Sequence, residues 1–180
     1  AREFSAGIAE IIKMAVCFNK DFFEWLEKND LRDEENIKVA IQKSVETKAW
    51  VVSQDEKEKG LRAALNYGHT FGHVIENETN YNTYLHGEAV GIGICMANDT
   101  SVKIGLMTQE ESDRVKNLLQ KYDIPTTYNI KDVEDFYEHF FLDKKSLDNK
   151  IKFIFAQGLG DCKITDEVSK EDIISVLKAF

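Results

Sequence analysis

Apolar residues recur at helical spacing over much of the chain, which predicts amphipathic helices rather than strands. The first two such stretches cover residues 5–28 and 34–53. In the second stretch, the apolar positions one turn apart are Ile37, Ala40, Ile41 and Val45. A third helix is expected from about Gly60 to Glu76.

A fourth helix, from about Tyr84 to Ile104, is rich in small residues. Glycine and alanine let a helix lie close to its neighbours because they present little side chain at the contact. The small positions are Gly87, Gly91, Gly93 and Ala97. We therefore expect this helix to pack tightly inside the molecule.

Capping patterns in the sequence predict two further helices. Thr108-x-x-Glu111 is a capping-box pattern that opens a helix ending before Pro125, and Ser169-x-x-Asp172 repeats it before the C-terminus. Between them, alternating residues at 150–155 and 162–165 flank a glycine-containing turn and predict one short hairpin. The expected fold is mainly α: one multi-helix domain over residues 1–180, with a β-hairpin near the C-terminus.

Composition narrows the classes of function. The chain has 180 residues, the size of one domain, and its net charge of −9 opposes nucleic acid or an anionic membrane as general partners. Its longest apolar run, 89–97, is far shorter than the roughly 20 residues of a membrane-spanning helix. Three widely spaced cysteines suggest no disulfide framework, so a cytoplasmic protein is expected. Because the chain does not begin with methionine, we expect it to be part of a longer polypeptide.

The segment 61–73 carries the most informative polar residues. At about 100° per residue, one narrow stripe of the expected helix holds Arg62, Asn66, His69 and His73, and Glu76 extends it by a turn. A solvated polar face is the ordinary explanation of such a stripe. Solvated faces are usually built from lysine and glutamate, however, whereas this one combines two histidines with neighbouring glycines. We therefore consider a ligand site here.

A metal site is one possibility that the histidines raise. His69 and His73 are four residues apart, but the His-Glu-x-x-His motif of zinc proteases is missing, and the pair alone is weak evidence for a metal. His86 begins the small-residue helix and can face its neighbour, whereas His139 is interpreted as structural. Two imidazoles and a carboxylate from three helices would form an open Zn²⁺ site.

Glu10 and Lys13 interrupt an otherwise apolar run in the first expected helix. Their i, i+3 spacing is that of a solvent-facing ion pair contributing a few tenths of a kcal/mol, about the usual value for such pairs. From the residues alone this is the simpler interpretation. Glu10 is nevertheless a candidate source of the carboxylate.

Five motifs in the same order resemble the C-terminal half of the 3-dehydroquinate synthase family, over essentially the whole chain. They are Gly7-Ile-Ala-Glu-Ile-Ile-Lys13; Lys48 followed by Val51-Val-x-x-Asp-Glu-x-Glu-x-Gly-Leu-Arg62; Leu65-Asn-Tyr-Gly-His-Thr-Phe-Gly-His73; His86-Gly-Glu-Ala-Val90; and Asp143-Lys-Lys145. The resemblance implies a helical domain that supplies the metal site and most of the substrate site. It also implies a separate N-terminal α/β domain that binds NAD. No Gly-x-Gly-x-x-Gly following a strand occurs in these 180 residues.

The resemblance also implies roles for individual residues. Glu10, His69 and His86 correspond to the ligands of Zn²⁺ or Co²⁺, with a substrate hydroxyl or water at the open position. Lys13 and His73 correspond to catalytic residues, although His73 can instead serve only to orient its neighbours. The substrate-contacting residues are Lys48, Arg62, Asn66 and one of Lys144 or Lys145. Such cations suit the carboxylate and phosphate of a seven-carbon keto acid phosphate.

The implied reaction converts 3-deoxy-arabino-heptulosonate 7-phosphate to 3-dehydroquinate plus phosphate in the shikimate pathway. NAD oxidises a secondary alcohol, phosphate is eliminated, the ketone is reduced again, and ring opening with an intramolecular aldol step closes the carbocycle. Net redox change is zero. The full-length enzyme is expected to be a homodimer, and the 180-residue chain alone is expected to be inactive.

The sequence leaves two alternatives open. Other sugar phosphate cyclases share much of the cationic set, whereas the architecturally related alcohol dehydrogenases act on small uncharged alcohols and have little use for it. From a different class, the chain could be a non-catalytic helical module for metal binding or oligomerisation.

Overall fold

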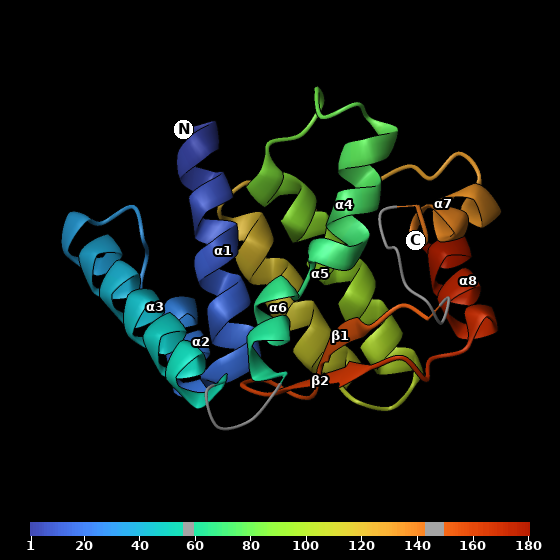
Figure 1. Ribbon diagram of the computed structural model, residues 1–180. Coiled ribbons are helices and arrows are strands. Elements are labelled where there is room, and N and C mark those ends of the chain that lie inside the picture. Colours follow the sequence, from blue (N-terminus) through green and yellow to red (C-terminus); the bar gives the residue numbers. More distant parts are fainter. Residues whose placement is uncertain (56–59, 143–149) are drawn as a thin grey trace.

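Helices surround one buried central helix in the computed structural model, which describes residues 1–55, 60–142 and 150–180 (Figure 1). The elements in chain order are α1 (Arg2–Phe18), α2 (Lys20–Lys28), α3 (Glu34–Asp55), the 3₁₀ helix η1 (Leu61–Asn66), α4 (His69–Glu78), α5 (His86–Lys103), α6 (Gln109–Lys121), α7 (Val133–His139), β1 (Phe153–Ala156), β2 (Cys162–Thr165) and α8 (Lys170–Ala179). The predicted mainly α fold with one C-terminal hairpin is confirmed.

Helix α5 is the centre of the molecule. It contacts α1, α4, α6, α8 and β1, and it is buried along most of its length. Close approach is possible because of its glycines. A Cβ atom at Gly87 would collide with the backbone of Ala6 in α1, and one at Gly93 would collide with the Gly68 carbonyl before α4. The predicted tight packing of this helix is confirmed.

The first expected helix is divided in two. Asn19 between α1 and α2 has an extended backbone, with φ −153° and ψ 96°, and its side chain accepts a 3.0 Å hydrogen bond from the Phe22 amide. Asparagine is favoured at such N-cap positions because its side chain satisfies an amide that lacks a helical partner. The prediction of one continuous helix over 5–28 was therefore wrong at residue 19.

The expected helix from Gly60 to Glu76 is also interrupted. Residues 61–66 form η1, Gly68 adopts the left-handed conformation with φ 82°, and α4 begins at His69. A non-glycine residue at 68 would be strained in this conformation and would also meet Ile94 and Val90. The prediction of one stripe on one continuous helix is therefore wrong, because Arg62 and Asn66 belong to η1, whereas His69, His73 and Glu76 belong to α4.

Helix α3 lies at the outer edge of the molecule beside α1 and α2 (Figure 1). Its buried positions are Ala40, Thr47 and Val51, whereas Ile41 and Val45 are 51% and 62% exposed. The prediction of a helix was confirmed, but the expected apolar face is only partly buried, because α3 contacts the rest of the described chain along a narrow strip.

The capping and hairpin predictions are confirmed. Thr108 and Glu111 form the reciprocal capping box of α6, and the Ser169 hydroxyl accepts from the Asp172 amide at 3.1 Å to begin α8. In the hairpin, β1 and β2 pair antiparallel, with Phe153 opposite Thr165. Helix α7 was not identified from the sequence. Its first turn is capped by Asp132.

Aromatic side chains join α7 to the body of the molecule. Phe140 packs edge-to-face on Phe71 of α4 and on Phe153 of β1, with ring centroids 5.3 Å apart in both pairs. Such pairs stabilise by about 0.5–1.5 kcal/mol beyond the burial of area. They hold the C-terminal end of α7 against α4. Among the described residues, no helix is both long and apolar enough to cross a membrane.

Candidate functional site

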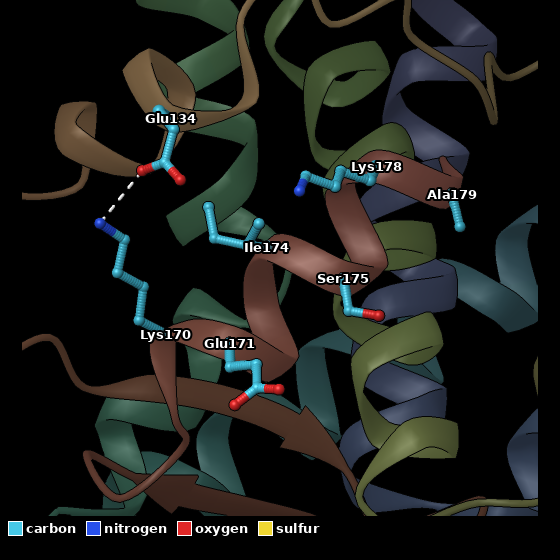
Figure 2. Close-up of a pocket in the computed structure, with 7 residues that line it drawn as sticks. All are labelled: Glu134, Lys170, Glu171, Ile174, Ser175, Lys178 and Ala179. Atoms are coloured by element: carbon cyan, nitrogen blue, oxygen red, sulfur yellow. Dashed lines mark ion pairs between the residues drawn. The ribbon is translucent and has the colours of Figure 1, made fainter.

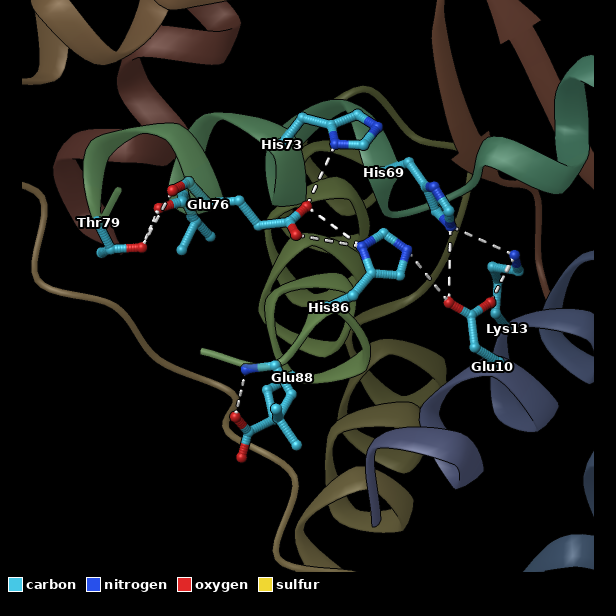
Figure 3. A network of polar contacts seen from close by, with 10 residues as sticks. Glu10, Lys13, His69, His73, Glu76, Thr79, His86 and Glu88 are labelled. Carbon is cyan, nitrogen blue, oxygen red and sulfur yellow. Dashed lines mark hydrogen bonds and ion pairs between the residues drawn. The ribbon is translucent and has the colours of Figure 1, made fainter. Parts of the chain in front are cut away.

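Three helices bring Glu10, His69 and His86 together (Figure 3). Glu10 lies in the middle of α1, while His69 and His86 are the first residues of α4 and α5. Glu10 Oε1 lies 3.8 Å from His69 Nε2 and 3.7 Å from His86 Nε2. The two imidazoles meet nearly edge-to-face, with ring centroids 5.0 Å apart. The structure therefore assembles three residues that are far apart in sequence.

This donor set fits a divalent metal ion. One ligand atom from each residue lies within 4.8 Å of the others. Metal–ligand bonds of about 2.0–2.1 Å in a tetrahedron place ligand atoms roughly 3.3 Å apart, so the observed 3.7 and 3.8 Å need to contract by only a few tenths of an ångström. Two imidazole nitrogens and one carboxylate oxygen leave the fourth tetrahedral position open, as in catalytic zinc sites.

Lys13 reinforces the carboxylate side of the cluster. Its ammonium lies 2.7 Å from Glu10 Oε2 and 3.4 Å from His69 Nε2, and its side chain is only 9% exposed. The interpretation of Glu10 and Lys13 as a solvent-facing pair is therefore wrong. Because Lys13 holds Oε2, the other carboxylate oxygen, Oε1, remains available to face both histidines.

Neighbouring charges and burial favour the protonation states of Glu10 and His69 that bind a metal ion. Burial raises the pKa of Glu10, but the charge and hydrogen bond of Lys13, helped by the two histidines, outweigh it and leave this pKa below its ordinary value. Burial and the neighbouring Lys13 charge lower the pKa of His69 to about 4, against a smaller opposing effect of Glu10. At neutral pH an ionised carboxylate thus faces a neutral imidazole, the forms that bind metals.

A second carboxylate, that of Glu76, supports the histidines from the opposite side (Figure 3). Its Oε1 lies 3.2 Å from His86 Nδ1 and 3.2 Å from His73 Nδ1, and its Oε2 lies 3.3 Å from His86 Nδ1. The side chain is 9% exposed. His86 is thus held between Glu76 and Glu10. The sequence placed Glu76 on the histidine stripe but gave it no role; its i+3 spacing from His73 was the available signal.

A cavity of about 190 Å³ opens beside the cluster. It is lined by Asn66, His69, Thr70, His73, Val74, Asn77, His139 and Phe140. The predicted substrate-side residues Asn66 and His73 therefore share one cavity with the candidate ligand His69. Asn66 reaches it from η1, although the two histidines belong to α4.

Two of the predicted substrate-binding cations, Arg62 and Lys48, do not line this cavity. Arg62 is 60% exposed and its Nε lies 3.9 Å from Asp55 Oδ2, while Lys48 is exposed on α3. Within the described ranges neither residue lines the cavity. The break at Gly68 separates Arg62 from the histidine face. Lys144 and Lys145 lie outside the described residues.

His139 was interpreted as structural, and it does form structural contacts. Its Nδ1 donates a 2.9 Å hydrogen bond to the Asp135 carbonyl and lies 3.8 Å from Glu78 Oε1. His139, Asp135 and Glu78 are close enough to form a second metal-like group. His139 Nδ1, the nitrogen nearest the two carboxylates, carries the proton that it donates to the Asp135 carbonyl, and therefore has no lone pair for a metal. Glu78 also accepts a hydrogen bond from the Tyr128 hydroxyl at 2.7 Å. The presence of His139 in the cavity wall was not foreseen.

A larger hollow of about 690 Å³ lies between α7 and α8 (Figure 2). Lys170 and Glu134 pair across it at 3.1 Å, and both side chains are largely exposed. The described residues that line it include no histidine and no member of the Glu10–His69–His86 cluster. The chemistry of the site therefore lies with α1, α4 and α5.

The fold and the cluster define a helical domain with a candidate metal centre between its helices. Residues 7–146 match the family described as 3-dehydroquinate synthase C-terminal, and the chain belongs to this family. The resemblance noted in the sequence is therefore confirmed.

Curated relatives agree with this assignment. The chain is 60% identical over 179 residues to a 3-dehydroquinate synthase of a Nitratiruptor species, covering 99% of this chain and 51% of the relative. It is 63% identical over 180 residues to that of a Sulfurovum species, covering 100% and 51%. The chain thus spans about half the length of the relatives it matches.

Solved structures share the fold. A 2-epi-5-epi-valiolone synthase from Streptomyces hygroscopicus subsp. jinggangensis 5008, with NAD⁺ and Zn²⁺ bound, superposes with a TM-score of 0.84 at 22% identity, over 97% of this chain and 50% of that one. A 2-deoxy-scyllo-inosose synthase complexed with carbaglucose-6-phosphate, NAD⁺ and Co²⁺ gives 0.75 at 24%, over 99% and 52%. At these identities the likeness concerns the fold.

Proposed function

We propose that this chain is the metal- and substrate-binding half of a 3-dehydroquinate synthase, which converts 3-deoxy-arabino-heptulosonate 7-phosphate to 3-dehydroquinate and phosphate. The observation that carries the proposal is the convergence of Glu10, His69 and His86 beside a cavity, in a chain of this family. The names of relatives at 60% and 63% identity support the same reaction.

Glu10 Oε1 and the Nε2 atoms of His69 and His86 are the proposed ligands of Zn²⁺ or Co²⁺. The fold neighbours with bound Zn²⁺ and Co²⁺ support these metals. When bound, such an ion supplies Lewis acidity that polarises the substrate oxygen at the open position. Lys13 keeps Glu10 ionised and oriented, and its ammonium adds positive charge next to His69.

His73 and Asn66 act on the cavity side. Glu76 accepts a hydrogen bond from the protonated Nδ1 of His73, which leaves Nε2 of His73 as the atom that can accept or return a proton. Asn66 offers an amide that can donate to a substrate oxygen and accept from a hydroxyl. These groups suit the hydroxyl-rich part of a sugar acid.

Arg62 and Lys48 are proposed to bind the anionic ends of the substrate. Both are exposed, so both are free to turn toward a ligand. A guanidinium binds a carboxylate or phosphate through two parallel hydrogen bonds, and an ammonium adds a point charge. The net charge of −9 does not oppose this, because binding depends on the local cations.

NAD is proposed to bind to an N-terminal domain that completes the enzyme. The relatives are about twice as long as this chain, and the fold neighbours were solved with NAD⁺. In this domain organisation residues 1–180 form the helical half, the active site lies between the two domains, and the full-length enzyme is a homodimer. A cytoplasmic location is also proposed; the free thiols of Cys17, Cys95 and Cys162 support it.

Phosphate release tests this function directly. With Zn²⁺, NAD and the keto acid phosphate present, the longer enzyme containing this chain should release phosphate and form 3-dehydroquinate. The 180-residue chain alone should not, and adding a separately produced N-terminal domain should restore turnover. Robust turnover by the chain alone would contradict the proposed division of the active site.

A second candidate is another sugar phosphate cyclase, which the fold likeness to the valiolone synthase favours. The two functions differ in the substrate's charge. A cyclase acting on a sugar phosphate without a carboxylate has less need of Arg62. Comparing phosphate release from the keto acid phosphate and from a sugar phosphate that lacks the carboxylate therefore separates them.

A further inference from the structure

We infer that Glu76 is a positioning residue that fixes the metal-side His86 and the cavity-side His73 in the same tautomer through one carboxylate. The inference rests on the proposed roles of these two histidines. It adds a link between them that neither the family match nor the relatives' names provide.

The contacts of Glu76 carry the first step. This residue lies in the last turn of α4, and its carboxylate is within 3.2 Å of Nδ1 on both His73 and His86. Its side chain is 9% exposed, so these two rings replace solvent as its partners. A buried carboxylate is costly unless its oxygens are satisfied, which makes the two N–H donors part of one arrangement.

The second step concerns the protons on the rings. A neutral imidazole has one N–H donor and one acceptor nitrogen, and an ionised carboxylate only accepts. Both rings therefore carry the proton on Nδ1 where they meet Glu76. For His86 this leaves the Nε2 lone pair facing Glu10 Oε1 at 3.7 Å, where a metal ion would bind. For His73 it leaves Nε2 free to exchange a proton.

The third step is the sharing of a single oxygen. Oε1 of Glu76 accepts from both rings, whereas Oε2 contacts His86 alone at 3.3 Å. Moving or neutralising this carboxylate must therefore disturb both histidines together. In Glu76→Gln, an amide nitrogen replaces one oxygen and cannot accept a hydrogen bond. Glu76→Asp keeps the charge but withdraws it by one methylene group.

Glu78 provides a matched control on the same helix. It lies two residues further along α4, and its carboxylate contacts Tyr128 and His139 rather than the two rings. Glu78→Gln therefore removes an equivalent charge without touching His73 or His86. A general effect of lost charge should appear in both variants, while positioning of the two rings should fail only when Glu76 is changed.

Nitrogen-15 NMR of the histidine rings in the metal-free 180-residue chain, at a pH where they are neutral, tests the inference. The parent and Glu78→Gln should show His73 and His86 protonated on Nδ1. Glu76→Gln and Glu76→Asp should both lose that uniform state, and each variant is first checked for an unchanged far-ultraviolet circular dichroism spectrum. If both rings keep the parent tautomer in both Glu76 variants, the inference is overturned.

Zinc titration of the same proteins gives a second readout. Loss of such a supporting partner typically weakens metal binding by about 10- to 100-fold, which is the change expected for Glu76→Gln but not for Glu78→Gln. Unchanged zinc affinity in Glu76→Gln would overturn the inference while leaving the proposed metal site standing. If the parent binds no zinc but the rings change tautomer as expected, the inference stands and the proposed metal site is wrong.

Discussion

The corner formed by α1, α4 and α5 differs sharply from the side formed by α3 and η1. In the first region, glycines let the backbones approach closely, and the buried Lys13 and Glu76 contact the candidate ligands. In the second region, Arg62 and Lys48 are exposed, and Arg62 Nε lies 3.9 Å from Asp55 Oδ2. The described part of the chain thus builds its candidate metal site by packing, but leaves two candidate anion-binding residues, Arg62 and Lys48, exposed.

This difference separates two parts of the proposed activity. Ligands already restrained by contacts with buried neighbours lose little further side-chain entropy when they bind, whereas exposed cations lose conformational freedom when a substrate orders them. Metal binding should therefore be a property of this chain alone. Recognition of substrate charge should depend on the rest of the enzyme.

The largest effect is expected from Gly93→Ala. A Cβ at this position would collide with the Gly68 carbonyl and crowd the Gly72 amide, and a rigid backbone cannot move aside cheaply. We expect about 3 kcal/mol less stability in urea denaturation, the upper part of the usual cost of overpacking. Zinc affinity should fall as well, because the displaced backbone carries His69.

Gly7→Ala is the control for this prediction. A Cβ at residue 7 meets no atom within 4 Å, and alanine is the better helix former. The free energy of unfolding of the 180-residue chain should therefore stay the same or rise slightly. If Gly93→Ala and Gly7→Ala lower the free energy of unfolding equally, the close packing of α5 on α4 does not stabilise this region.

A smaller effect is expected from pH in the metal-free chain. The pKa of His69 is lowered from 6.5 to about 4 in the folded state, so between these values the unfolded chain binds more protons. The free energy of unfolding should therefore fall by on the order of 2 kcal/mol as pH decreases from 6.5 to 4. Above pH 6.5, His69 should cause no such fall. Urea denaturation across this range should show a shallower slope in His69→Gln; equal slopes would contradict the assignment.

The smallest effect is expected on the exposed side. In the longer enzyme, Arg62→Ala should lower kcat/KM by at least about tenfold, or roughly 1.4 kcal/mol, through lost binding of an anionic group. The melting temperature should barely change, because the Arg62 side chain is 60% exposed and its Nε lies a long 3.9 Å from Asp55 Oδ2. Steady-state kinetics beside thermal melting checks both parts; parallel losses of stability and activity would make Arg62 a structural residue.

Structural features that depend on short local sequence patterns were predicted correctly. The capping box at Thr108 and the small residues of α5 correctly indicated a helix start and a tight contact. The breaks at Asn19 and Gly68 were missed, because apolar spacing continues across them while a side-chain cap and a left-handed backbone end the helices. Periodicity alone cannot detect such interruptions.

The site was predicted unevenly for a similar reason. Glu10, His69 and His86 were named through the family resemblance, and their convergence depends on packing between α1, α4 and α5 that spacing does not encode. The shared role of Glu76 depends on the distance between α4 and the start of α5. Its position on the histidine stripe was visible, but its two partners were not.

Zinc stoichiometry tests the central claim most directly. The 180-residue chain should bind one Zn²⁺ in calorimetry, and His69→Ala and His86→Ala should each abolish this binding. His139→Ala, which alters the other His-carboxylate group, should leave it intact. Retention of one zinc ion in both His69→Ala and His86→Ala, or its loss only in His139→Ala, would contradict a metal centre built from α1, α4 and α5.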